Sequence, residues 1–303
     1  MHTFPVLRLA GAASVLFLTA AAVPGLQARE PAVSAAKAGA KVNASGEVMG
    51  ALGEVFSFLQ PSSGQEARSV TADLTVTTAT GGAEFLKDAK FHVQVQPPSR
   101  LLVKAEVGDR SLTFCQDGEK VWIHVPKKDF LIRADNTVPQ FSTRPDSVQP
   151  VKFNLLSLPV SHSQLALLTV LLRMERQETA TAGEAEYVLS PSPAAAAMEL
   201  PVRNPSLTAT VLAGRDWPST LRYQDDRTKV ELAVSPPVIA AALPDAAWQP
   251  VTDSDDREEH VALSQIDRFV KVVTANLGSR IPTLPPAKGA RHLIAEEGAG
   301  PDW

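Results

Sequence analysis

The chain has 303 residues, of which 44% are hydrophobic and 20% charged, so it carries enough apolar side chains to bury a core and is not disordered as a whole. Its 29 Lys and Arg stand against 33 Asp and Glu, for a formal net charge of -4. Because no long basic run supplies the footprint that a phosphate backbone requires, we expect no nucleic acid among its partners.

Residues 1–28 are predicted to be a secretory signal peptide. A run of apolar and small residues extends from Leu9 to Val23, a Pro-Gly pair interrupts it, and a small-residue cleavage motif ends at Ala28. The alternative is a transmembrane anchor, but a span needs about 20 apolar residues and this run is shorter. No other stretch is apolar enough to span a bilayer, so we expect an exported, periplasmic protein that is soluble after cleavage.

The single cysteine, Cys115, excludes an internal disulfide. No cysteine lies at the cleavage site, where a bacterial lipid anchor would be attached. Cys115 lies within a predicted strand, and nothing nearby would lower its pKa, so we interpret it as a buried, inert thiol rather than a nucleophile.

Residues 29–47 are rich in Ala, Gly and Lys and are predicted to be a flexible linker. From Val48 to Leu59 the apolar residues recur at helical spacing. This spacing predicts a short amphipathic helix, although Gly50 and Gly53 weaken it.

Between residues 71 and 132 the apolar period changes to two, which predicts six strands in an antiparallel meander. The Asp-Gly pair at 117–118 is a strong hairpin signal, because Gly tolerates the positive φ of tight turns. Polar residues fill the alternate positions and predict a solvated outer face, here and in a later strand: Lys90, His92, Gln94, Gln96, Lys104, Glu106, Lys229 and Glu231.

A second block follows a break rich in Pro and polar residues at 136–150. The apolar segment 154–174 contains Pro159, which ends one part of it, and Ser163, which is placed to cap a helix running to Met174. Strand patterns then resume at 185–190, 206–213, 219–225 and 229–235.

The segment 254–277 is predicted to be an additional helix. Its apolar residues follow a helical stripe, acidic residues crowd its first turn, and Gly278 follows its end. The remaining residues, 279–303, are rich in Pro and Gly and are predicted to be disordered.

Together these elements predict one α+β domain over residues 48–278. About ten to eleven strands with a single apolar face are typical of an antiparallel sheet that is covered on one side. A sheet this large must curl or split. We therefore expect a curled antiparallel sheet, an incomplete β-barrel, with helices covering its concave face.

Residues 95–132 resemble the central meander of the LolA/LolB-like superfamily, and most of all its DUF2092 branch of predicted periplasmic proteins. The resemblance rests on the Pro97-Pro98 turn, on Arg100 near a strand start, on "DGEKVW" at 117–122 and on the turn from Pro126 to Phe130. In addition, "LPDAAWQP" at 243–250 is similar to the family's closing strand, with Trp248 where an aromatic is usual.

The resemblance covers residues 48–250. It implies an incomplete antiparallel barrel with a helical lid, whose cavity holds the acyl chains of lipoproteins in the best-characterised members.

No catalytic constellation is found. The histidines of the mature chain show no metalloprotease or paired-ligand spacing, and neither a Gly-rich phosphate loop nor a G-x-S-x-G elbow occurs. The acidic cluster at 253–259 offers oxygen ligands for Ca²⁺, but it lacks the EF-hand spacing, and a helix N-terminus is the favoured interpretation. We predict no catalytic residue, no metal and no cofactor.

The leading hypothesis is a non-enzymatic periplasmic protein that holds a lipid or an acylated polypeptide in an apolar groove. The alternatives are an envelope sensor or interaction module that recognises a protein partner, and a hydrolase with an unrecognised site. An ordinary hydrophobic core would show the same apolar pattern. The predicted groove is made of seven wall residues and two lid residues: Val93, Leu101, Val103, Phe114, Val121, Ile123 and Phe130, with Leu168 and Leu172.

Overall fold

The structure is a computed structural model that describes residues 43–61, 64, 66–138, 150–156, 167–196, 204–215, 217–252 and 256–268. The predicted signal peptide, the linker up to residue 42, Pro159, Ser163 and the tail from 279 lie outside these residues.

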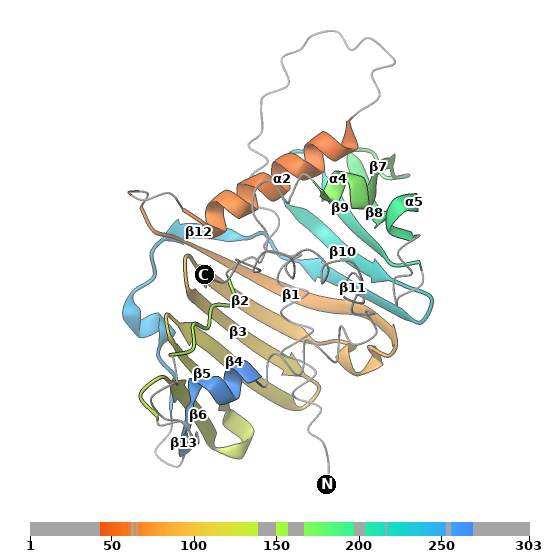
Figure 1. Cartoon of the computed structure of the whole chain (residues 1–303). Coiled ribbons are helices and arrows are strands. Elements are labelled where there is room, and N and C mark those ends of the chain that lie inside the picture. Colours follow the sequence, from red (N-terminus) through yellow and green to blue (C-terminus); the bar gives the residue numbers. More distant parts are fainter. Residues whose placement is uncertain are drawn as a thin grey trace, which may run out of the picture.

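Thirteen strands form one sheet, and the sheet curls without closing (Figure 1). Only the last strand of the chain pairs in parallel with its neighbour among the described residues. The path of the sheet runs β13-β6-β5-β4-β3-β2-β1-β11-β10-β9-β8-β7, and β12 pairs with β1 beside this path. The first meander is β1 (Arg68–Gly81), β2 (Lys90–Gln96), β3 (Arg100–Val107), β4 (Arg110–Asp117), β5 (Lys120–Val125) and β6 (Phe130–Asp135).

The second meander is β7 (Leu172–Glu178), β8 (Glu184–Pro191), β9 (Ser206–Leu212), β10 (Pro218–Gln224) and β11 (Thr228–Val234). The two meanders join where β11 pairs antiparallel with β1. The register of that pairing shifts between Val76 and Thr78, and such a bulge bends the strand and increases its twist. The expected curled antiparallel sheet is thus confirmed.

The β4–β5 hairpin shows why the sequence folds this way locally. Asp117 pairs with Lys120, so only two residues form the loop. Gly118 takes φ 63° at the first of them, a conformation in which a side chain would be strained. The hairpin predicted from the Asp-Gly pair is confirmed.

Helix α2 (Ala44–Leu59) lies across the concave face and reaches β7 (Figure 1). The side chain of Asn43 caps it by accepting a hydrogen bond from the Gly46 N–H at 3.1 Å. The helix begins four residues earlier than the periodicity predicted, so residues 44–47 are its first turn rather than the end of a linker.

The main core, here called the inner cluster, lies between this helix and the sheet. Val55 and Leu59 of α2 pack there with residues of β1 to β6, β10 and β11. Phe153, Leu156, Leu263 and Ile266 complete the cover from two segments far along the chain.

A second core on the opposite face corrects the expectation of one-sided burial. The outer cluster consists of Leu102, Cys115, Trp122, Leu131 and Trp248. Neighbouring residues on a strand point to opposite faces, so β3 to β6 are buried on both sides. The cover is the segment 243–249, which contains η4 (Asp245–Trp248).

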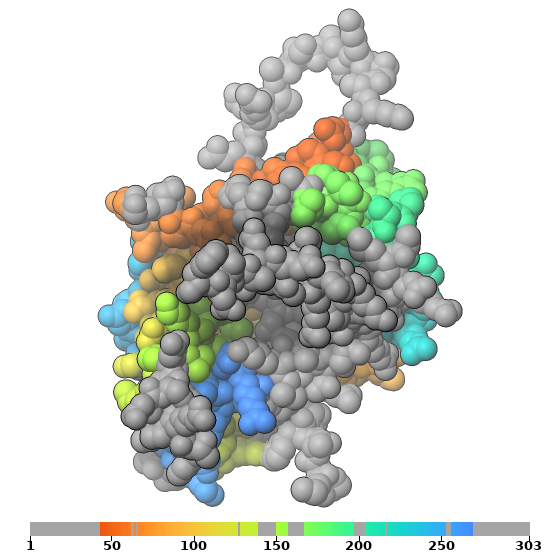
Figure 2. Space-filling model, viewed as in Figure 1, coloured from red at the N-terminus to blue at the C-terminus, as the bar shows by residue number. Residues whose placement is uncertain are grey.

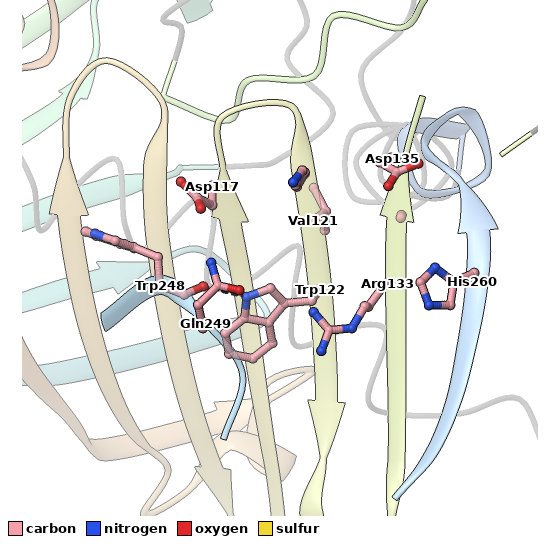
Figure 3. Close-up of a pocket in the computed structure, with 10 residues that line it drawn as sticks. Asp117, Val121, Trp122, Arg133, Asp135, Trp248, Gln249 and His260 are labelled. Atoms are coloured by element: carbon pink, nitrogen blue, oxygen red, sulfur yellow. Dashed lines mark hydrogen bonds between the residues drawn. The ribbon is translucent and has the colours of Figure 1, made fainter. Parts of the chain in front are cut away.

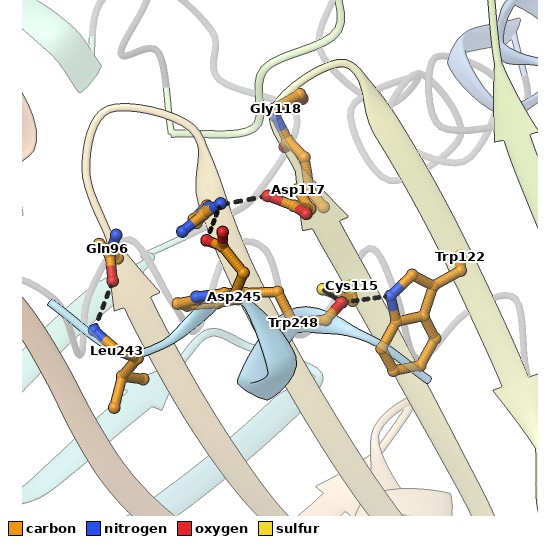
Figure 4. A network of polar contacts seen from close by, with 10 residues as sticks. Gln96, Cys115, Asp117, Gly118, Trp122, Leu243, Asp245 and Trp248 are labelled. Carbon is orange, nitrogen blue, oxygen red and sulfur yellow. Dashed lines mark hydrogen bonds and ion pairs between the residues drawn. The ribbon is translucent and has the colours of Figure 1, made fainter. Parts of the chain in front are cut away.

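Polar contacts hold this segment against the sheet (Figure 4). The carbonyl oxygen of Trp248 accepts a hydrogen bond from Trp122 Nε1 at 2.8 Å and one from Cys115 Sγ at 3.5 Å. Arg100 pairs with both Asp117 (2.7 Å) and Asp245 (2.8 Å). Residues 245–248 are therefore a short 3-10 turn laid across the sheet, and not the closing strand that the resemblance implied.

The side chain of Gln96 likewise differs from its expected exposure. It is buried, and its Oε1 accepts a hydrogen bond from the Leu243 N–H at 2.8 Å. His124 is likewise buried, beside Asp256, with 3.2 Å between its Nε2 and the carboxylate.

The predicted helix 163–174 is largely wrong within the described residues. Only the four residues of α4 (Leu168–Leu171) are helical there, and β7 begins at Leu172. Met174 is a buried strand residue whose partner is Leu189 on β8. Pairing with a neighbouring strand thus overrides the local helical pattern.

The predicted helix 254–277 is also corrected. Residues 257–262 form β13 (Arg257–Ala262), which pairs in parallel with β6 at the edge of the sheet, and helix occupies only 263–268 of the described part. Of the acidic residues described there, Glu258 lies in β13 and contacts Arg133 at 2.9 Å and His260 at 2.6 Å, so it is not part of a helix N-terminus. β12 (Val238–Ala241) was not predicted.

Candidate functional site

The predicted wall residues of the groove lie together on the concave face. Val93, Leu101, Val103, Phe114 and Val121 belong to the inner cluster and are 2% to 9% exposed. Ile123 packs against the cluster, and Phe130 is half-buried at the start of β6. The sequence therefore identified the face correctly, while a ligand-binding role for these residues stays a prediction.

The cover over this wall is held by a buried amide. Gln116 is 0% exposed; its Nε2 donates to the Phe153 carbonyl at 3.0 Å, and its Oε1 accepts from the Leu155 N–H at 2.9 Å. Because a buried amide is costly to leave unpaired, these bonds fix the segment 153–155 on the first meander. The first meander is thus closed on its concave side.

The two predicted lid residues lie elsewhere. Leu168 is half-buried in α4, and Leu172 is the half-buried first residue of β7. Neither belongs to the inner cluster. Both elements belong to the side of the second meander, because α4 contacts β7, and β7 also contacts α2. Figure 2 shows the green segment that contains α4 and β7 beside the orange helix α2.

The concave face of the second meander is less completely packed. The strand registers place one apolar row across it: Met174, Leu189, Leu207 and Tyr223. Met174 is 9% exposed, and the other three side chains are half-buried. Three neighbouring apolar side chains on the concave face of β8 to β10 are thus only partly covered.

Beside this row a polar cluster joins α2 to the sheet. Glu47 accepts a hydrogen bond from the Tyr187 hydroxyl at 2.7 Å and pairs with Arg176 at 3.4 Å. Arg176 also lies 5.9 Å from the centre of the Tyr187 ring. Its Nε is buried and has no hydrogen-bond partner in the part of the chain that the structure describes.

Burial and the bond to Glu47 raise the pKa of Tyr187 to about 12. The phenol therefore stays protonated at neutral pH and donates a hydrogen bond to the carboxylate. The cluster fastens the N-terminal part of α2 to β7 and β8.

Sequence reasoning missed this cluster because its members are far apart along the chain. Glu47 lies in the predicted linker, and Arg176 follows the predicted second helix. The only local signal was Tyr187 in a strand pattern, which does not identify a partner 140 positions away.

The described residues contain no group of three or more His, Cys, Asp or Glu side chains placed to hold a metal ion. No helix in the described ranges is both long and apolar enough to cross a membrane. Among the described residues, two histidines besides His260 contact a carboxylate: His92 with Asp73 at 2.7 Å and His124 with Asp256. Neither is part of the concave face.

Comparison with known proteins finds no matching family model and no matching curated protein. Among solved structures, the chain is similar to an uncharacterized conserved protein from Thermus thermophilus, with 11% identity and a TM-score of 0.34, covering 69% of this chain and 98% of that one.

It is also similar to a LolA superfamily protein from Nitrosomonas europaea, with 13% identity and a TM-score of 0.26, covering 64% of this chain and 97% of that one. A third similar structure is the lipoprotein LppX of Mycobacterium tuberculosis, with 14% identity and a TM-score of 0.28, covering 60% of this chain and 92% of that one. At these identities the likeness concerns the fold alone, and we assign the chain to no family.

Proposed function

We propose that this chain is a non-enzymatic binding protein of the bacterial periplasm that holds a lipid, or the acyl chain of a polypeptide, against the concave face of its sheet. The observation that carries the proposal is the half-buried apolar row of the second meander, from Met174 to Tyr223, lying beside helix α2. This position differs from the wall predicted on the first meander.

The energetics favour an apolar ligand at this row. Each buried CH₂ contributes roughly 0.8 kcal/mol, so an acyl chain of about ten methylenes supplies about 8 kcal/mol before the cost of ordering it. A polar ligand gains little from Leu189 and Leu207. The ligand class that fits is therefore a fatty acyl chain.

Helix α2 is suited to act as the lid. It is fastened at one end by Glu47 and at the other by Val55 and Leu59. A Cβ added at Gly50 or Gly53 would meet no atom within 4 Å outside the backbone of the helix. Packing therefore does not require these glycines, and each lowers helix stability by about 1 kcal/mol relative to Ala. A weakly formed helix with two attachments can release one of them at small cost.

The wall residues predicted on the first meander can contact a ligand only after α2 and the segment 153–155 move away from them. Val103 is 8% exposed, so a Glu there would be buried without a partner and would destabilise the fold itself. A test of binding that keeps the protein folded must therefore use the second meander.

The test compares Leu207→Glu with Ile239→Glu. Ile239 is an apolar strand residue on β12 that is 53% exposed, so its replacement is the matched control. The probe is a dansyl-labelled undecanoic acid, whose fluorescence rises in an apolar site, added to delipidated protein. We expect saturable binding that Leu207→Glu weakens at least tenfold and Ile239→Glu leaves unchanged.

Absence of saturable binding to the wild-type chain, or equal binding by Leu207→Glu, would contradict the proposal. In that case a protein partner retained from an envelope extract would favour the sensor or interaction module.

A further inference from the structure

A pocket of about 220 Å³ lies on the outer face of the sheet, away from the proposed acyl-binding row. Its base is formed by β4, β5, β6 and β13, and its rim by Trp248 and Gln249 of the segment that covers the outer cluster (Figure 3). Nothing in the proposed function uses it.

The strand register places three side chains of the pocket in one row. Trp122, Arg133 and His260 are neighbours on β5, β6 and β13, and Figure 3 shows them side by side. Lys120 precedes Trp122 by two residues and therefore faces the same side. The indole of Trp122 is fixed by its hydrogen bond to the Trp248 carbonyl oxygen.

The carboxylates of the pocket already have donors. Asp117 accepts from Arg100 at 2.7 Å. Asp135 accepts from both the N–H and the hydroxyl of Thr137, and these bonds hold its pKa below the ordinary value. The acids are therefore largely occupied within the protein.

The donors are in part unoccupied. Arg133 pairs through its Nε with Glu258 at 2.9 Å, and it pairs with no second carboxylate in the part of the chain that the structure describes. Lys120 is exposed and pairs with no carboxylate in the described part of the chain. Free donors thus outnumber free acceptors beside the indole of Trp122, which is 6% exposed, although the total charge of the lining is balanced.

From this juxtaposition we infer that the pocket binds a small organic acid, with its carboxylate between Lys120 and Arg133 and its flat apolar part against the indole of Trp122. The volume is below the range of typical drug-sized pockets, about 300–1,000 Å³, and limits the ligand to a small molecule. Directed hydrogen bonds from a guanidinium and an ammonium group select a carboxylate over its amide.

The test uses phenylacetate and phenylacetamide, which differ only in the charged group. The reporter is the indole N–H signal of Trp122 in a nitrogen-15 NMR spectrum, identified among the four tryptophans by its loss in Trp122→Phe. We expect phenylacetate to shift this signal saturably and phenylacetamide to bind at least tenfold more weakly.

The variant Lys120→Gln should weaken phenylacetate binding about fivefold, as for loss of one charge-assisted hydrogen bond at an exposed site. Lys104→Gln is the matched control, because Lys104 is an exposed lysine on β3 that lies on the same outer face of the sheet as Lys120. Leu207→Glu should leave this binding unchanged, which separates the pocket from the concave face.

No saturable shift, equal binding of acid and amide, or full binding by Lys120→Gln would each overturn the inference. None of these results bears on acyl binding at the second meander.

Discussion

The two meanders carry the same alternation of apolar and polar residues, yet they are packed differently. Strands β3 to β6 are buried on both faces, by the inner cluster and by the outer cluster. In β8 and β9 the concave apolar side chains Leu189 and Leu207 remain half-buried. Alternation therefore identifies the face of a strand, while its exposure depends on distant segments that cover it.

Each half contains natural reporters of its packing. Cys115, the only cysteine, lies in the outer cluster, and burial raises the pKa of its thiol to about 12. The only two tyrosines, Tyr187 and Tyr223, lie in the second meander. Thiol reactivity and tyrosine ionisation thus report on different halves of one sheet.

The largest effect is expected at Trp248, which is 0% exposed. Trp248→Ala removes the centre of the outer cluster and the ring that lies 5.8 Å from the Arg100 guanidinium. The free energy of unfolding should fall by about 3–5 kcal/mol, measured by urea denaturation, and the thiol of Cys115 should become reactive toward a disulfide reagent.

Val251→Ala is the control, because Val251 is 86% exposed near the same segment. An unchanged stability in Trp248→Ala would show that the outer cluster does not hold the first meander.

A smaller loss is expected where the two meanders join. Gly81, at φ 66°, pairs with Thr228, and a Cβ there would collide with the Arg227 carbonyl oxygen. Gly81→Ala should lower the free energy of unfolding by about 2–3 kcal/mol, the strain of a positive φ plus a backbone shift.

Gly108 also has a positive φ, 58°, but open space around it. Gly108→Ala should therefore cost only about 1–2 kcal/mol. Equal losses in the two variants would show that the close approach at the junction is unimportant.

The second meander should lose stability at alkaline pH. The pKa of Tyr187 is raised from 10.0 to about 12, by burial first and then by its bond to Glu47. A raised folded-state pKa stabilises the fold below pH 10, and this contribution is lost as the pH rises from 10 to 12.

The difference in unfolding free energy between wild type and Tyr187→Phe should therefore be largest at pH 8 and shrink at pH 11. Absorbance at 295 nm should show tyrosine ionisation well above pH 10. A titration near pH 10 for both tyrosines would contradict the packing of this half.

The smallest effect concerns the lid. Gly50→Ala and Gly53→Ala should each raise the free energy of unfolding by up to about 1 kcal/mol, because Ala is the better helix former and has room. Gly46→Ala should gain less, since its Cβ would lie 3.0 Å from the Asn43 side chain that caps the helix.

A more stable lid should also weaken binding of the dansyl-labelled acid by up to about fivefold, if opening requires α2 to unwind in part. Stabilisation without any change in binding would separate the helix from ligand entry.

Local patterns sufficed for much of the fold. The alternation of β2 and β3 and the Asp-Gly turn at 117–118 predicted a meander that the structure confirms. The predictions failed where distant segments meet. β13 pairs in parallel with β6 across more than a hundred residues, and no local period distinguishes such an edge strand from a helix.

The candidate site shows the same limit. The sequence placed Val103 and Phe114 on one apolar face, and the structure brings them together in the inner cluster. It did not reveal that Gln116 fastens a cover over them, or that Glu47 reaches Tyr187. Both contacts depend on side chains that are adjacent only in three dimensions.

The most direct test of the central claim is native mass spectrometry of the chain purified without detergent from a bacterial envelope, followed by organic extraction of the bound material. The account predicts a stoichiometric acylated species on the wild-type chain and its loss in Leu207→Glu. The bare protein mass for the wild-type chain, with nothing acylated in the extract, would contradict it.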